Sequence, residues 1–204
     1  MDFLILGFIT GLSLILAIGA QNIFVIEQGL KKQYVFIVCL ICSISDLLLI
    51  FLGIFLFEYF KFFFNSTVEL IFNILLFVFL IYFIINKLRI KYDNLNLSLE
   101  NNKHTPINII LKTLGFTYLN PHVYSDTVFF LGNFSKNFLT INKYYFGIGA
   151  SIASLLFFFI IGYLSKFLSK FLQSETIWRR INLFIIIFMS IITFYVMIEI
   201  FKFF

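Results

Sequence analysis

Six long apolar stretches of the sequence limit most strongly what this chain can fold into. They cover residues 3–26, 34–57, 67–86, 107–131, 143–164 and 181–203. A helix needs about 20 apolar residues to cross the hydrocarbon core of a membrane. Only 12% of the residues are charged, against about 25% in soluble domains. Because an open chain in lipid must satisfy its own backbone hydrogen bonds, and the stretches are too long for barrel strands, we predict an all-α integral membrane protein.

The net charge of +5 is explained by membrane anchoring rather than by binding to nucleic acid. Eleven of the 15 Lys and Arg residues lie in or beside the first, third and fifth connections. Cytoplasmic connections carry such an excess of positive residues, so these three are predicted in the cytoplasm and both termini outside. If one stretch does not cross, one terminus changes side; the third and sixth stretches, flanked by Glu69 and Glu199, are the candidates. The sequence contains no basic segment with interleaved aromatic residues, which would be typical of nucleic-acid binding.

The first stretch loses its apolar character near its end. Glycine and the amides of Gln21 and Asn22 interrupt it within Ala17–Asn22. Two interpretations stay open for the amides, which are hydrogen bonding between helices and direct lining of a substrate path.

The second stretch carries Asp46 near its middle, where a carboxylate costs roughly 2.5–3.5 kcal/mol on insertion. Such residues usually handle ions, protons or substrates; the alternative is a neutral Asp hydrogen-bonded between helices. Cys39, Cys42 and Ser43 share its helical face. The Cys39-x-x-Cys42 spacing suggests a thiol-redox function, but that motif is expected at a strand-to-helix turn of a soluble fold. We interpret these cysteines as small packing residues.

The fourth stretch holds its polar residues between Asn120 and Asp126. Pro121 has no N–H and its ring clashes with a preceding carbonyl, so the helix must kink or break there. Freed backbone groups at membrane depth are tolerated inside protein or along a cavity. His122 and Asp126 share a helix face, which suggests a proton relay or a carboxylate that orients the imidazole; polar packing at a kink is the alternative. No further ligand at metal-binding spacing occurs, so neither a metal nor another cofactor is expected.

Two faces of small residues predict close helix packing. Gly7 and Gly11 are four apart in the first stretch, and Gly147–Ser154 contains several such pairs in the fifth. The pattern is compatible with packing inside one subunit and with a homo-oligomer.

Interrupted helices at corresponding places in two halves of a chain point to a transporter site. The first and fourth stretches provide such a pair, at Ala20–Asn22 and Asn120–His122. We therefore predict one transmembrane transporter domain, residues 1–204, with six hydrophobic helices as two inverted three-helix repeats. Repeat one covers about 3–86, a cytoplasmic connection 87–106, and repeat two about 107–204.

Four stretches of the chain resemble the lysine/arginine exporter (LysE/ArgO-type) family of bacterial amino-acid transporters. They are Gly7–Lys32 (GFITGLSLILAIGAQNIFVIEQGLKK), Cys39–Gly53 (CLICSISDLLLIFLG), Gly115–Gly132 (GFTYLNPHVYSDTVFFLG) and Gly147–Gly162 (GIGASIASLLFFFIIG). The resemblance implies a multi-pass protein of the bacterial inner (cytoplasmic) membrane that exports L-arginine and/or L-lysine, not an enzyme. The polar intramembrane residues of the family correspond here to Gln21, Asn22, Asp46, Asn120, Pro121, His122 and Asp126.

The same residues suggest how a basic amino acid is bound. Asp46 and Asp126 are the only acids deep in the predicted stretches, so we expect them to hold the cationic side chain. The carboxylate of the ligand favours helix N-termini after the breaks. Export is expected to couple to the proton gradient or the membrane potential. The alternatives are another amino acid or a cation on the same scaffold, and a membrane thiol-redox protein using Cys39 and Cys42.

Overall fold

The computed structural model is all-helical over the residues that it describes, as predicted. It describes the chain except residues 1, 17–18, 64–65, 89–104, 172–174 and 204. The helices in chain order are α1 (Asp2–Ile15), α2 (Ala20–Lys31), α3 (Val35–Phe63), α4 (Ser66–Leu88), α5 (Pro106–Tyr118), α6 (Pro121–Tyr124), the π-helix η1 (Ser125–Phe130), α7 (Leu131–Ser135), α8 (Thr140–Leu168), the 3₁₀-helix η2 (Ser169–Phe171) and α9 (Glu175–Phe201). Most of the predicted connection 87–106 lies outside the described residues.

Several of these helices are long and apolar enough to cross a membrane. Among the described residues four segments qualify, Val35–Phe57, Ser66–Ile85, Thr140–Leu168 and Arg180–Phe201. Helices α1 and α2 qualify only together, as a pair bent by 83°. The fourth predicted stretch is divided among α5, α6, η1 and α7, because the helix is interrupted at Pro121. The chain is therefore a multi-pass membrane protein, whereas six full crossings stay a prediction.

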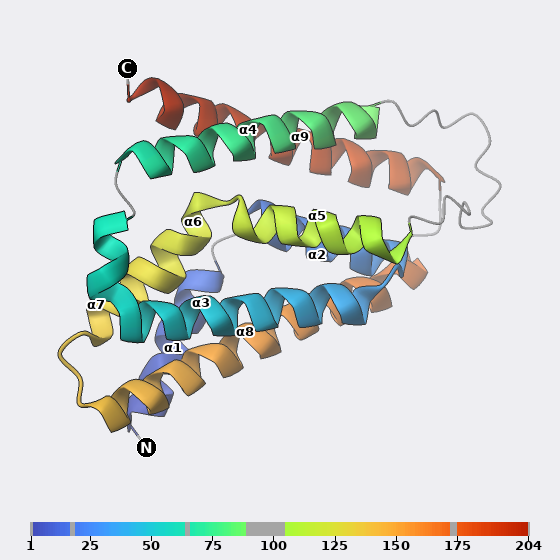
Figure 1. Ribbon diagram of the computed structural model, residues 1–204. Helices are drawn as coiled ribbons and strands as arrows, with labels where there is room; N and C mark the ends of the chain where they lie inside the picture. The colour runs from blue at the N-terminus through green and yellow to red at the C-terminus, as the bar shows by residue number, and fades with distance from the viewer. Residues whose placement is uncertain (1, 17–18, 64–65, 89–104, 172–174, 204) are drawn as a thin grey trace.

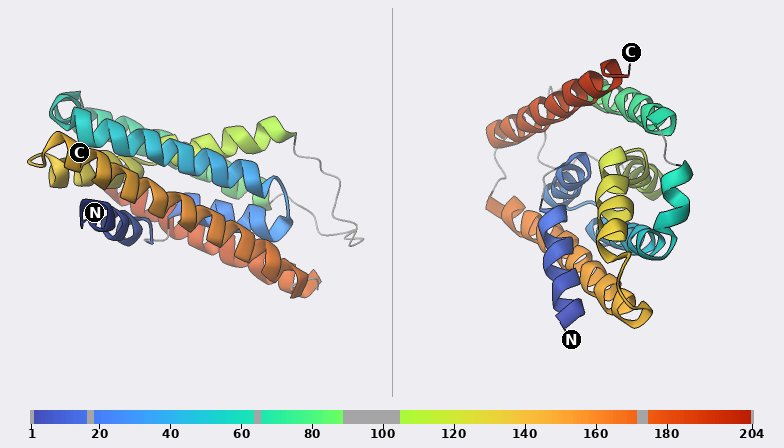
Figure 2. Two further views of the ribbon diagram at one scale, coloured as in Figure 1. Left: turned by 90° about the horizontal axis from the view of Figure 1, so that it is seen from below. Right: turned by 90° about the vertical axis from the view of Figure 1, so that its left-hand side faces the viewer.

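The helices are arranged in three layers when viewed end-on (Figure 2, right panel). Helices α4 and α9 form one layer, and α1 with α8 forms the opposite one. The central helix α2 lies between them, and almost all of its side chains are buried although it is the most polar of the long helices. Both termini lie at the same end of the molecule, opposite the connection between α2 and α3 (Figure 1).

Helices α1 and α8 cross closely through glycines. A Cβ on Gly7 would collide with the carbonyl of Phe146, and one on Gly149 would collide with the carbonyl of Leu4. Gly11 packs against Ala150 with slightly more room, since an added Cβ on Gly11 would lie 2.9 Å from the Cα of Ala150. The small residues of the first and fifth stretches therefore pack against each other within one subunit. A homo-oligomer stays a prediction.

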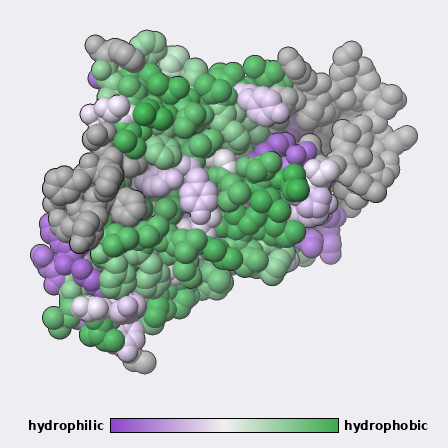
Figure 3. All heavy atoms as spheres, viewed as in Figure 1, coloured by the Kyte–Doolittle hydropathy of each residue, from purple (hydrophilic) through white to green (hydrophobic). Residues whose placement is uncertain are grey.

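A buried aromatic cluster joins α2 to α4 and α5. The ring of Phe116 lies 4.8 Å from that of Phe24 and 5.0 Å from that of Phe83, measured between centroids. Cys39 and Cys42 belong to the same core. The outer face is apolar as well, since green residues cover most of the view in Figure 3 and the strongest purple gathers towards its left and right edges. Such a surface suits lipid rather than water.

Candidate functional site

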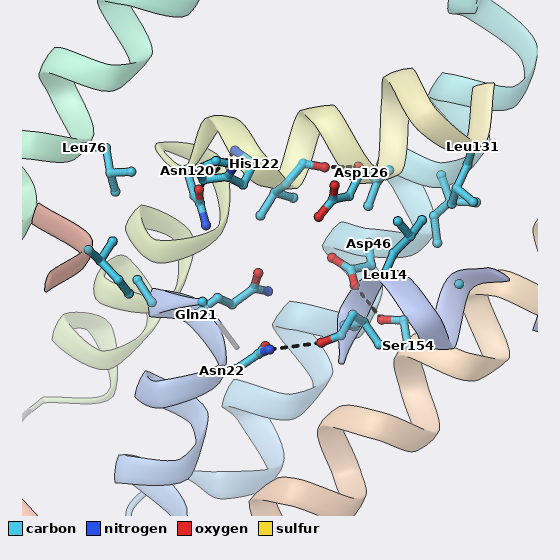
Figure 4. A pocket seen from close by; sticks show the side chains of 18 of the residues that line it. Leu14, Gln21, Asn22, Asp46, Leu76, Asn120, His122, Asp126, Leu131 and Ser154 are labelled. Atoms are coloured by element: carbon cyan, nitrogen blue, oxygen red, sulfur yellow. Dashed lines mark hydrogen bonds between the residues drawn. The ribbon is translucent and has the colours of Figure 1, made fainter. Parts of the chain in front are cut away.

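A cavity of about 590 Å³ lies where the two interrupted helices meet α3, α8 and α9. Figure 4 shows its polar side chains pointing towards one another from α2, α3, α6 and η1. The lining includes six of the seven predicted site residues, namely Gln21, Asn22, Asp46, Asn120, His122 and Asp126. Pro121 is buried directly between two of them. The structure therefore brings the predicted residues together, although it does not test what they bind.

The first interruption lies slightly earlier than the sequence suggested. Helix α1 ends at Ile15 and α2 begins at Ala20, so Gln21 and Asn22 belong to the first turn of α2 rather than to the break. Gly19 precedes this turn in an extended conformation and provides no side-chain cap. The first N–H groups of a helix have no partner within the helix. A helix end therefore already lies in polar surroundings, which also suit the polar side chains of Gln21 and Asn22. The N-terminus of α2 therefore points the positive end of its helix dipole at the cavity.

The two amides of this turn have different surroundings. Asn22 Nδ2 donates to the carbonyl of Ile15 at 3.1 Å and so connects the two sides of the break. Gln21 Nε2 is buried and makes no regular hydrogen bond in the described part of the chain, although the Gln21 side chain lies close enough to the Cys42 thiol to interact with it. An unsatisfied buried donor costs about 1–3 kcal/mol, so Gln21 is the amide that a ligand would stabilise most.

The second interruption is repaired by its own residues. Pro121 occupies the first position of α6, where its missing N–H removes nothing from the helix. Asn120 caps this helix, because its Oδ1 accepts a hydrogen bond from the backbone N–H of His122 at 3.1 Å. The predicted break at Pro121 is thus confirmed. The two interruptions face each other, since a Cβ on Gly19 would lie 4.0 Å from Asn120 Nδ2.

Two carboxylates reach the cavity from different halves of the chain. Asp46 is 4% exposed and accepts a hydrogen bond from Ser154 Oγ at 2.7 Å. Asp126 lies on η1, is partly buried, and its charge is close enough to interact with that of Asp46 (Figure 4). A π-helical turn often marks a functional site, because it changes the direction of side chains in the surrounding helix. Two acidic side chains that line one cavity favour a cationic occupant.

His122 lies at the edge of the cavity rather than against Asp126. Its ring centroid is 5.6 Å from that of Tyr195 on α9, with the planes inclined by 33°. In the described structure no hydrogen bond joins the side chains of His122 and Asp126. The predicted orientation of the imidazole by that carboxylate is therefore not seen, although the two residues do share the cavity.

The two cysteines do not line the cavity. Both are free thiols with 0% exposure, and Cys39 Sγ donates to the carbonyl of Phe158 at 3.2 Å. The environment is that of packing residues, as predicted, and no reactant in solution reaches either sulfur. Within the described residues no group of three or more His, Cys, Asp or Glu side chains is placed to hold a metal ion.

Several lining residues were missed by the sequence reasoning. Ser154 was noticed only as a small packing residue, whereas its hydroxyl faces Asp46. No site residue was expected in the sixth stretch, yet four residues of α9 form one wall of the cavity, namely Phe188, Ile191, Ile192 and Tyr195. A helix that is apolar on all sides carries no signal for which face lines a cavity and which faces lipid. Only Tyr195, a polar aromatic one turn before Glu199, offered a hint.

Known proteins support the same picture. A family model described as LysE type translocator matches residues 12–200. The chain is 33% identical to the arginine exporter protein ArgO of Pectobacterium carotovorum, over 88% of this chain and 88% of that protein. It is also 33% identical to the arginine exporter protein ArgO of Salmonella typhimurium, over 92% of this chain and 90% of that protein. No solved structure matches the chain.

Proposed function

The chain belongs to the LysE type translocator family, and from this membership we propose that it is a secondary transporter that exports L-arginine and/or L-lysine across the bacterial inner membrane. The relatives named arginine exporter cover most of the chain, which supports arginine in particular. The observation that carries the proposal is the pair of carboxylates, Asp46 and Asp126, in one cavity that the N-terminus of α2 also lines.

The chemistry of the cavity fits a basic amino acid at both of its ends. A guanidinium or ammonium group needs anionic partners, which Asp46 and Asp126 supply. The substrate carboxylate needs N–H donors, which the first turn of α2 and the side chain of Gln21 supply. Asn22, Asn120 and His122 complete the polar lining. A neutral amino acid would leave the carboxylates without a counter-charge.

We place this cavity at the interface of two inverted three-helix repeats, about 3–86 and 107–204, joined by a cytoplasmic connection 87–106. Three features support this arrangement. The two interruptions meet at Gly19 and Asn120, and the third helices of the two halves, α4 and α9, pack on each other. Both termini lie at one end of the molecule, as an even number of crossings requires (Figure 1).

Export needs an energy source, because the substrate carries a net positive charge. Moving one charge outward against an inside-negative potential costs about 2.3 kcal/mol per 100 mV. Proton antiport would offset this cost, with Asp46, Asp126 or His122 as the carrier. The positive residues of the odd-numbered connections place these connections in the cytoplasm, so both termini would face outward.

Transport by the purified chain in lipid vesicles tests the proposal. We expect labelled arginine to exchange, unlabelled lysine to compete, and a neutral amino acid to compete poorly. An imposed pH gradient should change the rate of net transport if protons are exchanged for the substrate. Equal competition by neutral amino acids would contradict the assignment of a basic substrate.

A further inference from the structure

One face of α9 leads from the cavity towards the end of the molecule at which both termini lie. Phe188, Ile192 and Tyr195 line the cavity, and Glu199 follows Tyr195 by one helical turn. Residues four apart on a helix are neighbours on one face. The carboxylate of Glu199 therefore continues this row of side chains one helical turn beyond the cavity.

The edge of the cavity next to Glu199 is formed by the rings of Tyr195 and His122 and is partly exposed. The side chain of Tyr195 is 47% exposed although it lines the cavity, and its ring lies beside that of His122. The imidazole of His122 and the hydroxyl of Tyr195 are both close enough to interact with the carboxylate of Glu199. An aromatic face attracts cations, so Tyr195 connects the inner carboxylates to an outer one.

The outer carboxylate already holds a cation. Lys202 Nζ lies 2.6 Å from Glu199 Oε1, and the lysine side chain is 62% exposed. This hydrogen bond raises the pKa of Lys202, so the group stays charged. A primary ammonium on a flexible stem is the same chemical group as the end of a lysine substrate, and it resembles the guanidinium of arginine in charge.

We propose that Glu199 and Tyr195 form an outer binding subsite for the cationic side chain of the exported amino acid, and that Lys202 occupies the subsite in its absence. Passage through a membrane is fastest when a charged species meets several weak sites rather than one strong site. A weak outer carboxylate draws the cation away from Asp46 and Asp126, and Lys202 then displaces it. This inference rests on the proposed function and on the outward position of the C-terminus.

Two substitutions that break the same ion pair test the subsite, because the proposal gives them opposite effects. Glu199→Gln removes the subsite, whereas Lys202→Gln removes only the internal competitor. Arginine exchange is measured with the full chain in right-side-out and inverted membrane vesicles. Citrulline, which has a similar shape and no side-chain charge, serves as the control substrate.

We expect Glu199→Gln to raise the half-saturation concentration for arginine at the outer side by about 2- to 5-fold, as for an exposed ion pair. Lys202→Gln should lower it by a similar factor. Neither variant should change the value at the cytoplasmic side or the value for citrulline. A purely structural ion pair predicts shifts in the same direction, and any pattern without opposite signs at the outer side overturns the proposal. If the unsubstituted chain exchanges no arginine, the proposed function fails instead.

Discussion

Asp46→Asn removes one negative charge from the cavity and leaves its shape almost unchanged. The amide has the size of the carboxylate, and Ser154 Oγ can still donate to its carbonyl oxygen, as it does to Asp46 at 2.7 Å. A neutral side chain also costs less to insert into the membrane than a charged one. The variant therefore isolates the charge from the packing.

The expected loss follows from the burial of this carboxylate. Asp46 is 4% exposed, so water screens it little. A cation about 4 Å from a carboxylate gains about 4 kcal/mol at an effective dielectric constant of about 20. Since about 1.4 kcal/mol corresponds to a factor of ten, kcat/KM for arginine should fall about 1,000-fold. Citrulline has no side-chain charge, so its transport should change far less.

The assay is exchange of labelled arginine or citrulline in vesicles that contain equal amounts of each variant, with immunoblotting of membranes to confirm insertion. Glu69→Gln is the matched control, because it makes the same chemical change on α4 at a side chain that does not line the cavity. The reasoning is refuted if Asp46→Asn retains full arginine exchange, or if arginine and citrulline lose activity by the same factor.

Three further predictions concern the helix packing, the cysteines and the helix ends. Gly7→Val pushes a side chain into the backbone of α8 and should cost about 1–3 kcal/mol, seen as a lower midpoint of thermal unfolding in detergent; Gly19→Ala has room and should not shift it, and equal midpoints would argue against the crossing. Alanine at both cysteines should retain export, and the native thiols should resist labelling because both are fully buried; lost export with normal insertion would revive the thiol-redox hypothesis. Asn120→Ala removes a helix cap and should destabilise the protein by about 1 kcal/mol. Gln21→Ala should mainly raise the half-saturation concentration for arginine. The reverse pattern would assign capping to Gln21 and substrate binding to Asn120.

The interruptions could be predicted from the sequence because individual residues cause them. Pro121 cannot continue a helix, and amides within an apolar stretch need partners. The location of the first break was wrong by a few residues, since the amides turned out to begin α2 rather than to end α1. Helix ends depend on which backbone groups the surroundings can satisfy, and those surroundings come from other parts of the chain.

Other features of the site could not be predicted because they depend on which helices meet. The small residues around Gly7 predicted a close crossing but not its partner, which is α8. Ser154 carries no local sign that it faces Asp46, 108 residues away in sequence. The π-helix that carries Asp126 likewise has no residue pattern that distinguishes it from an ordinary turn. The polar residues of the cavity could therefore be predicted from the sequence, whereas its apolar wall and its hydrogen bonds could not.

The structure also divides the polar residues of the two breaks into two groups. The amides of Asn22 and Asn120 bind backbone groups at their own interruptions, so part of their role is to make broken helices tolerable within a membrane. Gln21 Nε2 makes no such bond to a backbone group in the described chain. Under the proposed function, substrate recognition is expected to fall mainly to Gln21, the N-terminus of α2 and the two carboxylates. The inverted repeat that we propose would explain this division, because it brings two interrupted helices together at one cavity.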